Sequence, residues 1–377
     1  MKWEKVKLGS VTDSCLGKML DQNKNKGDYQ PYLANVNVRW GEFDLEDLPL
    51  MKFEESEQER YELKYGDLVI CEGGEPGRCA IWKEQIPNMK IQKALHRVRV
   101  HDCLDYRYLF YWFLLAGKTG ELDQYFTGAT IKHMPGQKLK EVVIDKPPLE
   151  IQHRIADILS AYDDLIENNQ KQIKLLEEAA QRLYKEWFVD LRFPGHENTE
   201  IVDGVPEGWS RTNINEILTF HRGYDLTKNE MKAGRYPVVG STTVIGYHNE
   251  FKIKGPGIVT GRSGSLGKYQ FIWDNFWPHN TSLYISDYKD HNIFFVYSLL
   301  QTVDFASLNN GGAIPTLNRN VLSNIEVIEP TDELQEMFAK IAEAQYRKIR
   351  NLEKQNNQLK MARDVLLPKL MSGEVEV

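Results

Sequence analysis

The sequence predicts an α+β protein in which two similar globular α/β domains are separated by two long antiparallel coiled-coil helices, with a pseudo-twofold internal repeat. Two long segments have helical character, the chain matches itself when shifted by 183 residues, and the rest of each half alternates short apolar runs with turn residues. We place the boundaries at 1–147 (first domain), 148–192 (central helix), 193–331 (linker and second domain) and 332–377 (C-terminal helix).

The internal repeat is visible at separate points along the chain. Gln152 corresponds to Gln335 at this shift, and with a small change of shift "LVICEGGEPGR" from Leu68 resembles "IVTGRSGSLGK" from Ile258. Because separate matches keep their order, we interpret them as a duplication and not as a chance likeness between two helices. Each half is therefore expected to be a globular domain followed by one long helix.

Inside the domains, short apolar runs typical of strands alternate with glycine-containing loops. These runs are DLVIC, CAIW, HRVRV and EVVID in the first half, and YPVVG, GIVTG, YQFIW, SLYIS and NIEVIE in the second. The segments DYRYLFYWFLL and HNIFFVYSLLQ each predict one buried helix. The mixture predicts domains of the α+β class.

In the two long segments, seam positions recur at alternating spacings of four and three, which predicts a coiled-coil seam. The apolar seam residues are Ile151, Ile155, Ile158, Tyr162, Leu165, Leu176 and Leu183 in the first helix, and Leu334, Phe338, Ile341, Leu352, Leu359 and Leu366 in the second. Each helix would be roughly 50–60 Å long. A helix with one apolar stripe needs a partner, and the path of the chain favours antiparallel pairing of the two. The alternative is that each helix lies on its own domain.

Composition argues against several classes of protein. No apolar run is long enough to cross a bilayer, and the start "MKWEKVKLGS" has no apolar signal segment, so we expect a cytoplasmic protein without a membrane partner. The four cysteines form no C-x-x-C pair and the nine histidines are scattered, so no metal site is expected. Because no phosphate-binding loop or catalytic constellation is found, we expect no enzymatic activity of the chain itself.

The net charge of −7 argues against a protein that binds nucleic acid over its whole surface. The excess of acidic over basic residues is concentrated in residues 148–200, which carry 6 Lys and Arg against 11 Asp and Glu. The remaining segments are nearly neutral, and a neutral domain can still present a basic face.

Two similar domains held apart by a stiff rod suit a ligand with two features at a fixed spacing. Duplex DNA is such a ligand, and glycine-rich loops with basic residues occur at matching places in both halves. For each residue alone, an ordinary exposed loop position is the more common explanation. The DNA-binding candidates are Arg78, Lys93, Arg97, Lys132, His133, Lys138, Arg222, Tyr224, Arg262, Ser263, Ser265, Lys268, His279, Asn280, Asn318 and Arg319.

A set of longer segments is specific when taken together. They are "PPLEIQHRIADILSAYDDLIENN", "LYKEWFVDLRFPG", "VPEGW", "GGAIPTLNRNVLSNIEV" and "LLPKLMSGEVEV". With the duplication and the two helices, they resemble the DNA-specificity subunit of type I restriction–modification enzymes, and the resemblance covers nearly the whole chain.

This resemblance implies two target-recognition domains, each of which recognises one half of a bipartite sequence in double-stranded DNA. The helices would set the gap between the halves and dock two modification (methyltransferase) subunits. The resemblance implies no cofactor for the chain itself: S-adenosylmethionine would belong to the modification subunits, and ATP and magnesium to restriction (motor-nuclease) subunits.

Two other classes of protein remain open from the residues alone. One is a recognition module that works as an isolated DNA-binding protein. The other is a stand-alone coiled-coil scaffold that displays two protein- or carbohydrate-binding domains. The sequence predicts neither the target bases nor the length of the gap.

Overall fold

The computed structural model describes residues 3–19, 21, 25–262, 267–303 and 325–377, and the chain folds as two compact units. Unit 1 contains residues 1–168 and 355–377, and unit 2 contains residues 169–354. Both boundaries fall inside the long helices α4 (Leu149–Tyr184) and α8 (Asp332–Ser372), so each helix contributes one part to each unit. Among the described residues, no helix is long and apolar enough to span a membrane.

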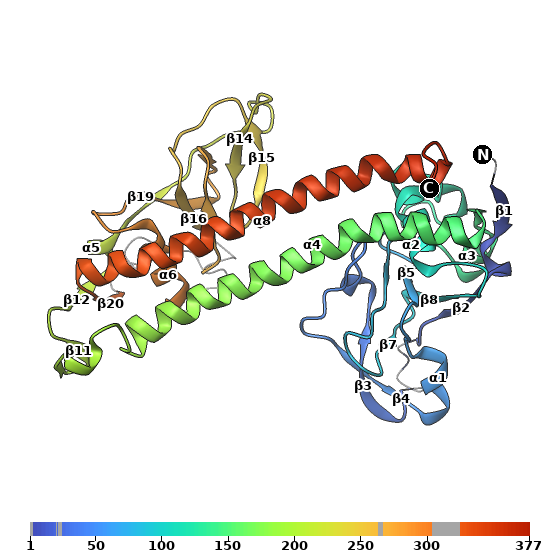
Figure 1. The fold of residues 1–377 in the computed structure, drawn as a ribbon, viewed down its shortest axis with the longest axis horizontal. Coiled ribbons are helices and arrows are strands. Elements are labelled where there is room, and N and C mark those ends of the chain that lie inside the picture. The colour runs from blue at the N-terminus through green and yellow to red at the C-terminus, as the bar shows by residue number, and fades with distance from the viewer. Residues whose placement is uncertain (1–2, 20, 22–24, 263–266, 304–324) are drawn as a thin grey trace. The chain divides into compact units, whose positions relative to one another are not determined.

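The globular part of unit 1 contains a four-stranded sheet, a three-stranded sheet and a two-stranded ribbon (Figure 1). Its strands are β1 (Glu4–Lys7), β2 (Thr12–Leu16), β3 (Asp28–Leu33), β4 (Leu50–Phe53), β5 (Leu68–Cys71), β6 (Cys79–Ile81), β7 (Lys90–Ile91), β8 (Leu95–Val100) and β9 (Val143–Lys146). Its helices are α1 (Gln58–Tyr61), α2 (Tyr106–Thr119) and α3 (Gly136–Glu141). The sheet orders are β2-β8-β5-β6, β4-β3-β7 and β1-β9.

Unit 2 repeats these three sheets and adds the two-stranded ribbon β10–β11. Its strands are β10 (Ile201–Val202), β11 (Val205–Pro206), β12 (Ser210–Asn213), β13 (Thr219–Arg222), β14 (Tyr236–Val239), β15 (Val244–His248), β16 (Gly257–Gly261), β17 (Tyr269–Ile272), β18 (Trp277–Pro278), β19 (Ser282–Asp287) and β20 (Glu326–Glu329). Its helices are α5 (Ile214–Ile217) and α6 (Ile293–Thr302). The orders β13-β19-β16-β17, β15-β14-β18 and β12-β20 match those of unit 1 strand by strand.

Even the strand directions agree between the two units. In each three-stranded sheet the central strand has one antiparallel and one parallel neighbour, with β3 pairing β4 and β7, and β14 pairing β15 and β18. The ribbons β1–β9 and β12–β20 are both antiparallel. The predicted α+β class and internal repeat are therefore confirmed.

Two equivalent glutamines anchor the long helices to their domains. Gln152 is fully buried, and its side-chain amide donates to the Pro147 carbonyl 2.8 Å away, while its carbonyl accepts from the backbone N–H of Asp105 at 2.9 Å. Gln335 is also buried and donates to the Pro330 carbonyl at 2.9 Å. Each contact with a proline joins the first turn of a long helix to the residue that directly follows the preceding strand, β9 or β20.

Within each unit the two helices run antiparallel. In unit 1 an ion pair joins Asp163 of α4 to Arg363 of α8. In unit 2 the rings of Tyr184 and Phe338 lie 5.5 Å apart, edge to face. The early part of α4 thus meets the late part of α8 in unit 1, and the order is reversed in unit 2, as antiparallel pairing requires.

The buried stripes differ in part from the predicted seam. Ile155, Phe338 and Leu352 are buried, but Ile158, Leu165 and Ile341 are exposed by 37%, 39% and 42%. Placing these three in the seam was wrong. The reason is that each helix packs in both units against a globular domain as well as its partner helix, so that Ala156 and Leu159, for example, belong to the core of unit 1.

Candidate nucleic-acid interface

In unit 2 the structure brings together two segments that the sequence singles out. The backbone of Tyr224, after β13, forms a parallel bridge with His279, which precedes β19. Asn280 donates to the carboxylate of Asp225, and the Arg222 guanidinium lies 3.6 Å from the same carboxylate. The four predicted residues Arg222, Tyr224, His279 and Asn280 therefore form one cluster.

Gly223 makes this close approach possible. A Cβ atom at this position would lie 2.0 Å from the His279 carbonyl oxygen, which no side chain allows. The ring of His279 is then held by the Thr281 hydroxyl at 3.0 Å and the Leu226 carbonyl at 3.2 Å. Beneath the cluster, the phenol groups of Tyr224 and Tyr284 share a hydrogen bond of 3.0 Å. Burial, then this contact, raises the pKa of Tyr284, so the phenol stays neutral.

Arg262 lies next to this cluster, and Lys268 lies on the neighbouring hairpin between β16 and β17. The backbone N–H of Arg262, after β16, donates to the Thr281 carbonyl at 3.1 Å. Lys268 is exposed and immediately precedes β17. With Arg222 half-exposed, these cations give one end of the four-stranded sheet several donors that can reach a phosphate or a base edge.

In unit 1 two predicted segments also meet. The loop between β5 and β6 forms a bridge from Gly73 to His133, and the N–H of Met134 donates to the Glu72 carbonyl at 2.8 Å. His133 and Lys132 are exposed on this segment, and Lys132 lies 3.3 Å from Asp123. Lys138, in α3, pairs with Glu141 at 2.8 Å, and this hydrogen bond is the main reason that the pKa of Glu141 is lowered.

Two predicted arginines have partners inside unit 1. Arg78 donates to Glu75 at 3.0 Å and to the Asn35 carbonyl at 2.9 Å. Arg97 donates to the carbonyl oxygens of Glu59 and Glu62 at 3.3 and 3.4 Å. Both guanidiniums thus bind backbone carbonyls of their own unit, whereas Lys93 is exposed in the turn between β7 and β8.

Four predicted DNA-binding residues, Ser263, Ser265, Asn318 and Arg319, lie outside the described residues. Conversely, sequence reasoning missed Asp225, whose carboxylate joins Arg222 to Asn280. The only sequence feature that could have indicated this role is its position three residues after Arg222, which allows an ion pair between the two side chains. Sequence reasoning also missed Trp40 and Phe126, which line a hollow beside the unit 1 loops and have no local motif.

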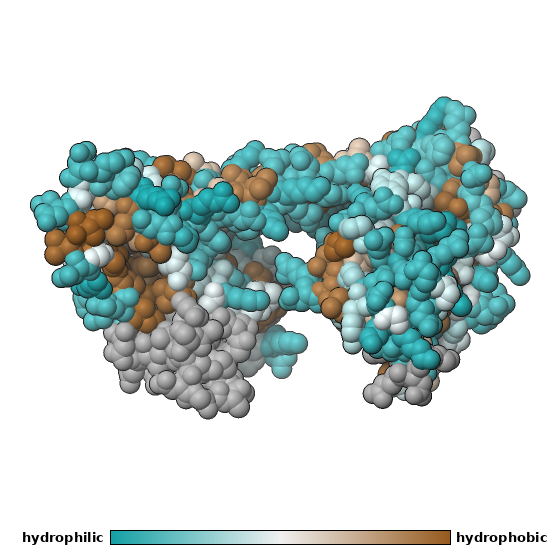
Figure 2. Space-filling model, turned by 90° about the horizontal axis from the view of Figure 1, so that it is seen from below, coloured by the Kyte–Doolittle hydropathy of each residue, from teal (hydrophilic) through white to brown (hydrophobic). Residues whose placement is uncertain are grey.

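Burial raises the pKa of the Cys71 and Cys79 thiols, which therefore remain protonated and poor nucleophiles. In the parts of the chain that the structure describes, no group of three His, Cys, Asp or Glu side chains could hold a metal ion. On the face drawn in Figure 2, hydrophilic side chains predominate and apolar ones form separate patches.

Comparison with known proteins gives a consistent result. The family described as "Type I restriction modification DNA specificity domain" matches residues 1–178 and 206–361. The type I restriction enzyme MjaIX specificity subunit of Methanocaldococcus jannaschii is 29% identical in an alignment of 342 residues, which covers 83% of this chain and 78% of that protein. The MjaVIII specificity subunit of the same organism is 28% identical over 228 residues, covering 59% and 50% of the two chains.

A similar fold is found among solved structures. The crystal structure of a type I restriction–modification S subunit from M. genitalium superposes with a TM-score of 0.61 at 19% sequence identity. The superposition covers 98% of this chain and 96% of that one. The likeness therefore extends over both units and both long helices.

Proposed function

Because the chain belongs to the family of type I restriction–modification DNA specificity domains, we propose that each of its two domains recognises one half of a bipartite DNA sequence. The chain is the specificity subunit of such a system. The observation that carries the proposal is that the order and direction of the strands in three sheets repeat in two segments that both match the family. Two copies of one recognition domain suit two half-sites better than one continuous site.

The clusters described above supply the chemistry that DNA recognition needs. Arg222, Arg262 and Lys268 offer donors for phosphate oxygens or for guanine, and Asn280 offers an amide of the kind that pairs with adenine. The carboxylate of Asp225 orients two of these groups at once. The domain therefore combines cations that position the duplex with polar groups that can distinguish bases.

The proposed partners follow from the family. Double-stranded DNA would be the ligand, and two modification subunits would dock on the chain together with restriction subunits. S-adenosylmethionine, ATP and magnesium would be bound by those partners, and the chain itself would catalyse no step. The exposed apolar side chains of Ile158, Leu165 and Ile341 on the long helices are compatible with docking of another protein.

The alternative of a stand-alone scaffold with protein- or carbohydrate-binding domains gains no support from the comparisons, because the two relatives from Methanocaldococcus jannaschii are named as specificity subunits. The isolated DNA-binding module differs from the proposed subunit only in its partners. Co-purification with a modification subunit separates these two possibilities.

The experiment that tests DNA recognition is a salt titration of binding. Arg262→Ala and Lys268→Ala should each weaken binding, and each side chain that contacts a phosphate should lower the slope of log K against log salt by about one. Arg211→Ala is the control, because Arg211 is an exposed cation of the same unit that lies on β12, away from the predicted loops. Unchanged slopes in both variants would show that these side chains do not contact phosphates, and the absence of any binding at low salt would refute DNA recognition.

A further inference from the structure

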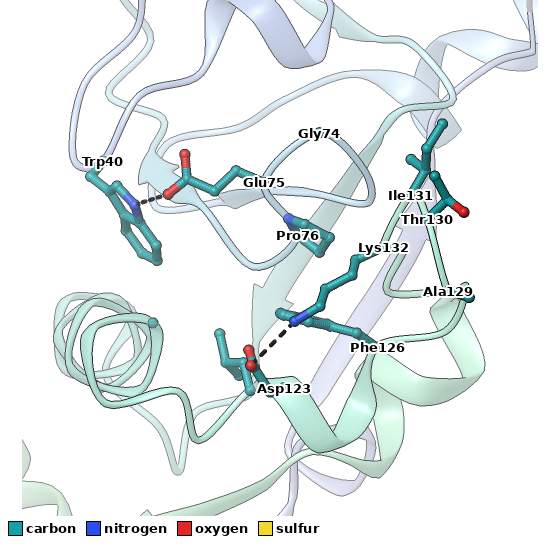
Figure 3. A pocket seen from close by; sticks show the side chains of 12 residues that line it. Trp40, Gly74, Glu75, Pro76, Asp123, Phe126, Ala129, Thr130, Ile131 and Lys132 are labelled. Carbon is teal, nitrogen blue, oxygen red and sulfur yellow. Dashed lines mark hydrogen bonds and ion pairs between the residues drawn. The ribbon is translucent and has the colours of Figure 1, made fainter.

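Unit 1 contains a surface hollow of about 590 Å³ beside the loop between β5 and β6 (Figure 3). Its lining includes two aromatic rings, two carboxylates and one ammonium group, contributed by Trp40, Glu75, Asp123, Phe126 and Lys132. This volume lies within the range that is usual for sites that bind small molecules.

Two segments that carry predicted DNA-binding residues form part of the wall of the hollow, beside Trp40 and Asp123. Glu75 and Pro76 belong to the glycine-rich loop between β5 and β6, and Phe126 and Lys132 belong to the segment before α3. The bridge from Gly73 to His133 and the hydrogen bond from Met134 to Glu72 fix these segments against each other. The hollow is therefore built into the surface that should face the duplex.

The indole of Trp40 is fixed in position. Its Nε1–H donates to Glu75 at 2.8 Å, and its ring lies against Gly117 of α2. A Cβ atom at residue 117 would come within 2.6 Å of the ring, so the glycine is required for this placement. The hollow thus has a preformed aromatic surface, and Phe126 provides a second one from another part of the chain (Figure 3). Aromatic surfaces of this kind stack on bases of any sequence.

The carboxylate of Glu75 is also fixed in position. One oxygen accepts from Trp40, and the other accepts from the Arg78 guanidinium at 3.0 Å. Each oxygen can accept one further hydrogen bond. An amino group of adenine, cytosine or guanine would supply that donor, whereas the one ring donor of thymine, N3–H, lies between two carbonyl oxygens that a carboxylate repels. The site therefore favours a base with an exocyclic amino group.

Lys132 extends across the hollow toward Asp123 (Figure 3). Its ammonium group lies 3.3 Å from that carboxylate and 5.6 Å from the centre of the Phe126 ring. Both side chains of the pair are more than half exposed, at 54% and 60%, so water screens the attraction and the pair separates easily. The ammonium can then turn to the phosphate of a nucleotide that enters the hollow.

We propose that this hollow receives one nucleobase of the bound DNA, turned out of the base stack. Its ring would lie against Trp40 and Phe126, and its amino group would donate to Glu75. A base within the duplex presents only its edge, whereas this hollow offers ring faces and a hydrogen-bond acceptor to a base that has left the stack. The proposal rests on the proposed function and adds to it a contact that distinguishes amino-bearing bases from thymine.

The test is a scan of DNA duplexes in which each base of the first half-site in turn is opposed by an abasic position. Turning a base out is easier when it has no pairing partner. At one position the chain, together with its modification subunits, should bind about tenfold or more tightly than to the intact duplex. The adenine that becomes methylated is left out, because methyltransferases turn out their target base themselves.

Glu75→Gln and Phe126→Leu should each abolish this gain while binding of the second half-site is retained. Glu46→Gln, an equal charge change at an exposed residue of the same unit, should keep it. Thermal melting of each variant shows whether unit 1 remains folded. If both variants are folded, both must lose the gain in affinity. The inference is overturned if no position gains affinity, or if the gain survives in a folded variant. Absence of all sequence-specific binding would instead refute the proposed function.

Discussion

At the scale of single residues, the same side chain occupies equivalent positions of the two halves, Gln152 and Gln335, where each long helix begins. Both side chains are buried, and both donate to a proline carbonyl five residues earlier. Losing such a contact would leave a buried polar group without a partner, which costs about 1–3 kcal/mol. The sequence repeat aligned these two residues. The structure shows why they are equivalent, because both make the same buried hydrogen bond to a proline carbonyl.

His96 makes the stability of unit 1 depend on pH. It is buried, and its Nε2 lies 2.9 Å from the Met134 carbonyl oxygen. Burial lowers the pKa of this imidazole, against smaller opposing effects of Met134 and of the Glu72 charge. The unfolded chain therefore takes up the proton at higher pH than the folded chain. The free energy of unfolding should fall as pH decreases through the ordinary histidine pKa of about 6.5.

Urea unfolding between about pH 7.5 and 5.5 measures this dependence. The midpoint of wild-type unit 1 should decrease toward acid, and His96→Gln should lose part of that decrease. His221→Gln, which alters an exposed histidine of unit 2, should keep it. An identical pH dependence in the His96 variant would contradict the assignment.

The contacts of individual residues were harder to predict than their positions. Arg78 and Arg97 lie in segments whose sequences suggest DNA binding. In the structure, their guanidinium groups donate hydrogen bonds to backbone carbonyl groups of unit 1. Whether an arginine faces the ligand or its own loop depends on tertiary neighbours that are distant in sequence. Trp40 could not be found for the same reason, because its contacts are to Glu75 and Gly117, which are distant from it in sequence.

At the scale of elements, the strands and helices were largely predictable because each has a local pattern. The runs DLVIC, GIVTG and SLYIS correspond to β5, β16 and β19, and the two aromatic-rich segments to α2 and α6. The seam was predicted less well, because the spacing of four and three describes a helix with a single partner. In the structure α4 has two partners in each unit, a helix and a domain, and its buried face is correspondingly wider.

The two ends of the helix pair use different chemistry for the same task. In unit 1, Asp163 accepts from the Tyr111 hydroxyl of α2 at 2.7 Å and pairs with Arg363 of α8, so it links three helices. In unit 2 the equivalent of Asp163 is Tyr346, whose ring lies 5.2 Å from Tyr297 of α6 and is stacked with Phe294 at 6.0 Å. A charged contact in one unit thus replaces an aromatic cluster in the other.

Removing the charge of Arg363 should therefore destabilise unit 1 measurably. Arg363 is only 15% exposed and Asp163 29%, so Arg363→Met would leave a partly buried carboxylate without its cation. We expect a loss of about 1–3 kcal/mol in the free energy of unfolding. Arg347→Met is the matched control on the same helix, because its pair with Glu343 is exposed, and it should change stability by less than about 0.5 kcal/mol. Equal effects of the two substitutions in chemical denaturation would contradict this account.

At the scale of the whole molecule, the proposal is that the long helices set the distance between the two half-sites. Both helices are continuous across the unit boundaries: α4 passes through Asn168 and Asn169, and α8 passes through Lys354 and Gln355. A helix rises about 1.5 Å per residue, so deletion of four residues from the middle of α4 removes about 6 Å.

Such a deletion should change the number of base pairs between the two half-sites while both half-site sequences persist. Selection of bound duplexes from a random library measures both properties at once. A variant with the wild-type gap, or one that recognises a different half-site sequence, would show that α4 does not determine the spacing. Four alanine substitutions at exposed positions of α4 keep its length and serve as the control.

The central claim is that the chain recognises two separate half-sites, one with each domain. The most direct measurement is sequencing of methylated adenines in cells that carry this chain together with its modification subunits, with and without replacement of residues 206–331 by those of a relative. The account predicts a bipartite methylated motif with a fixed gap, of which only one half changes after the replacement. A continuous motif, or a replacement that alters both halves together, would contradict it.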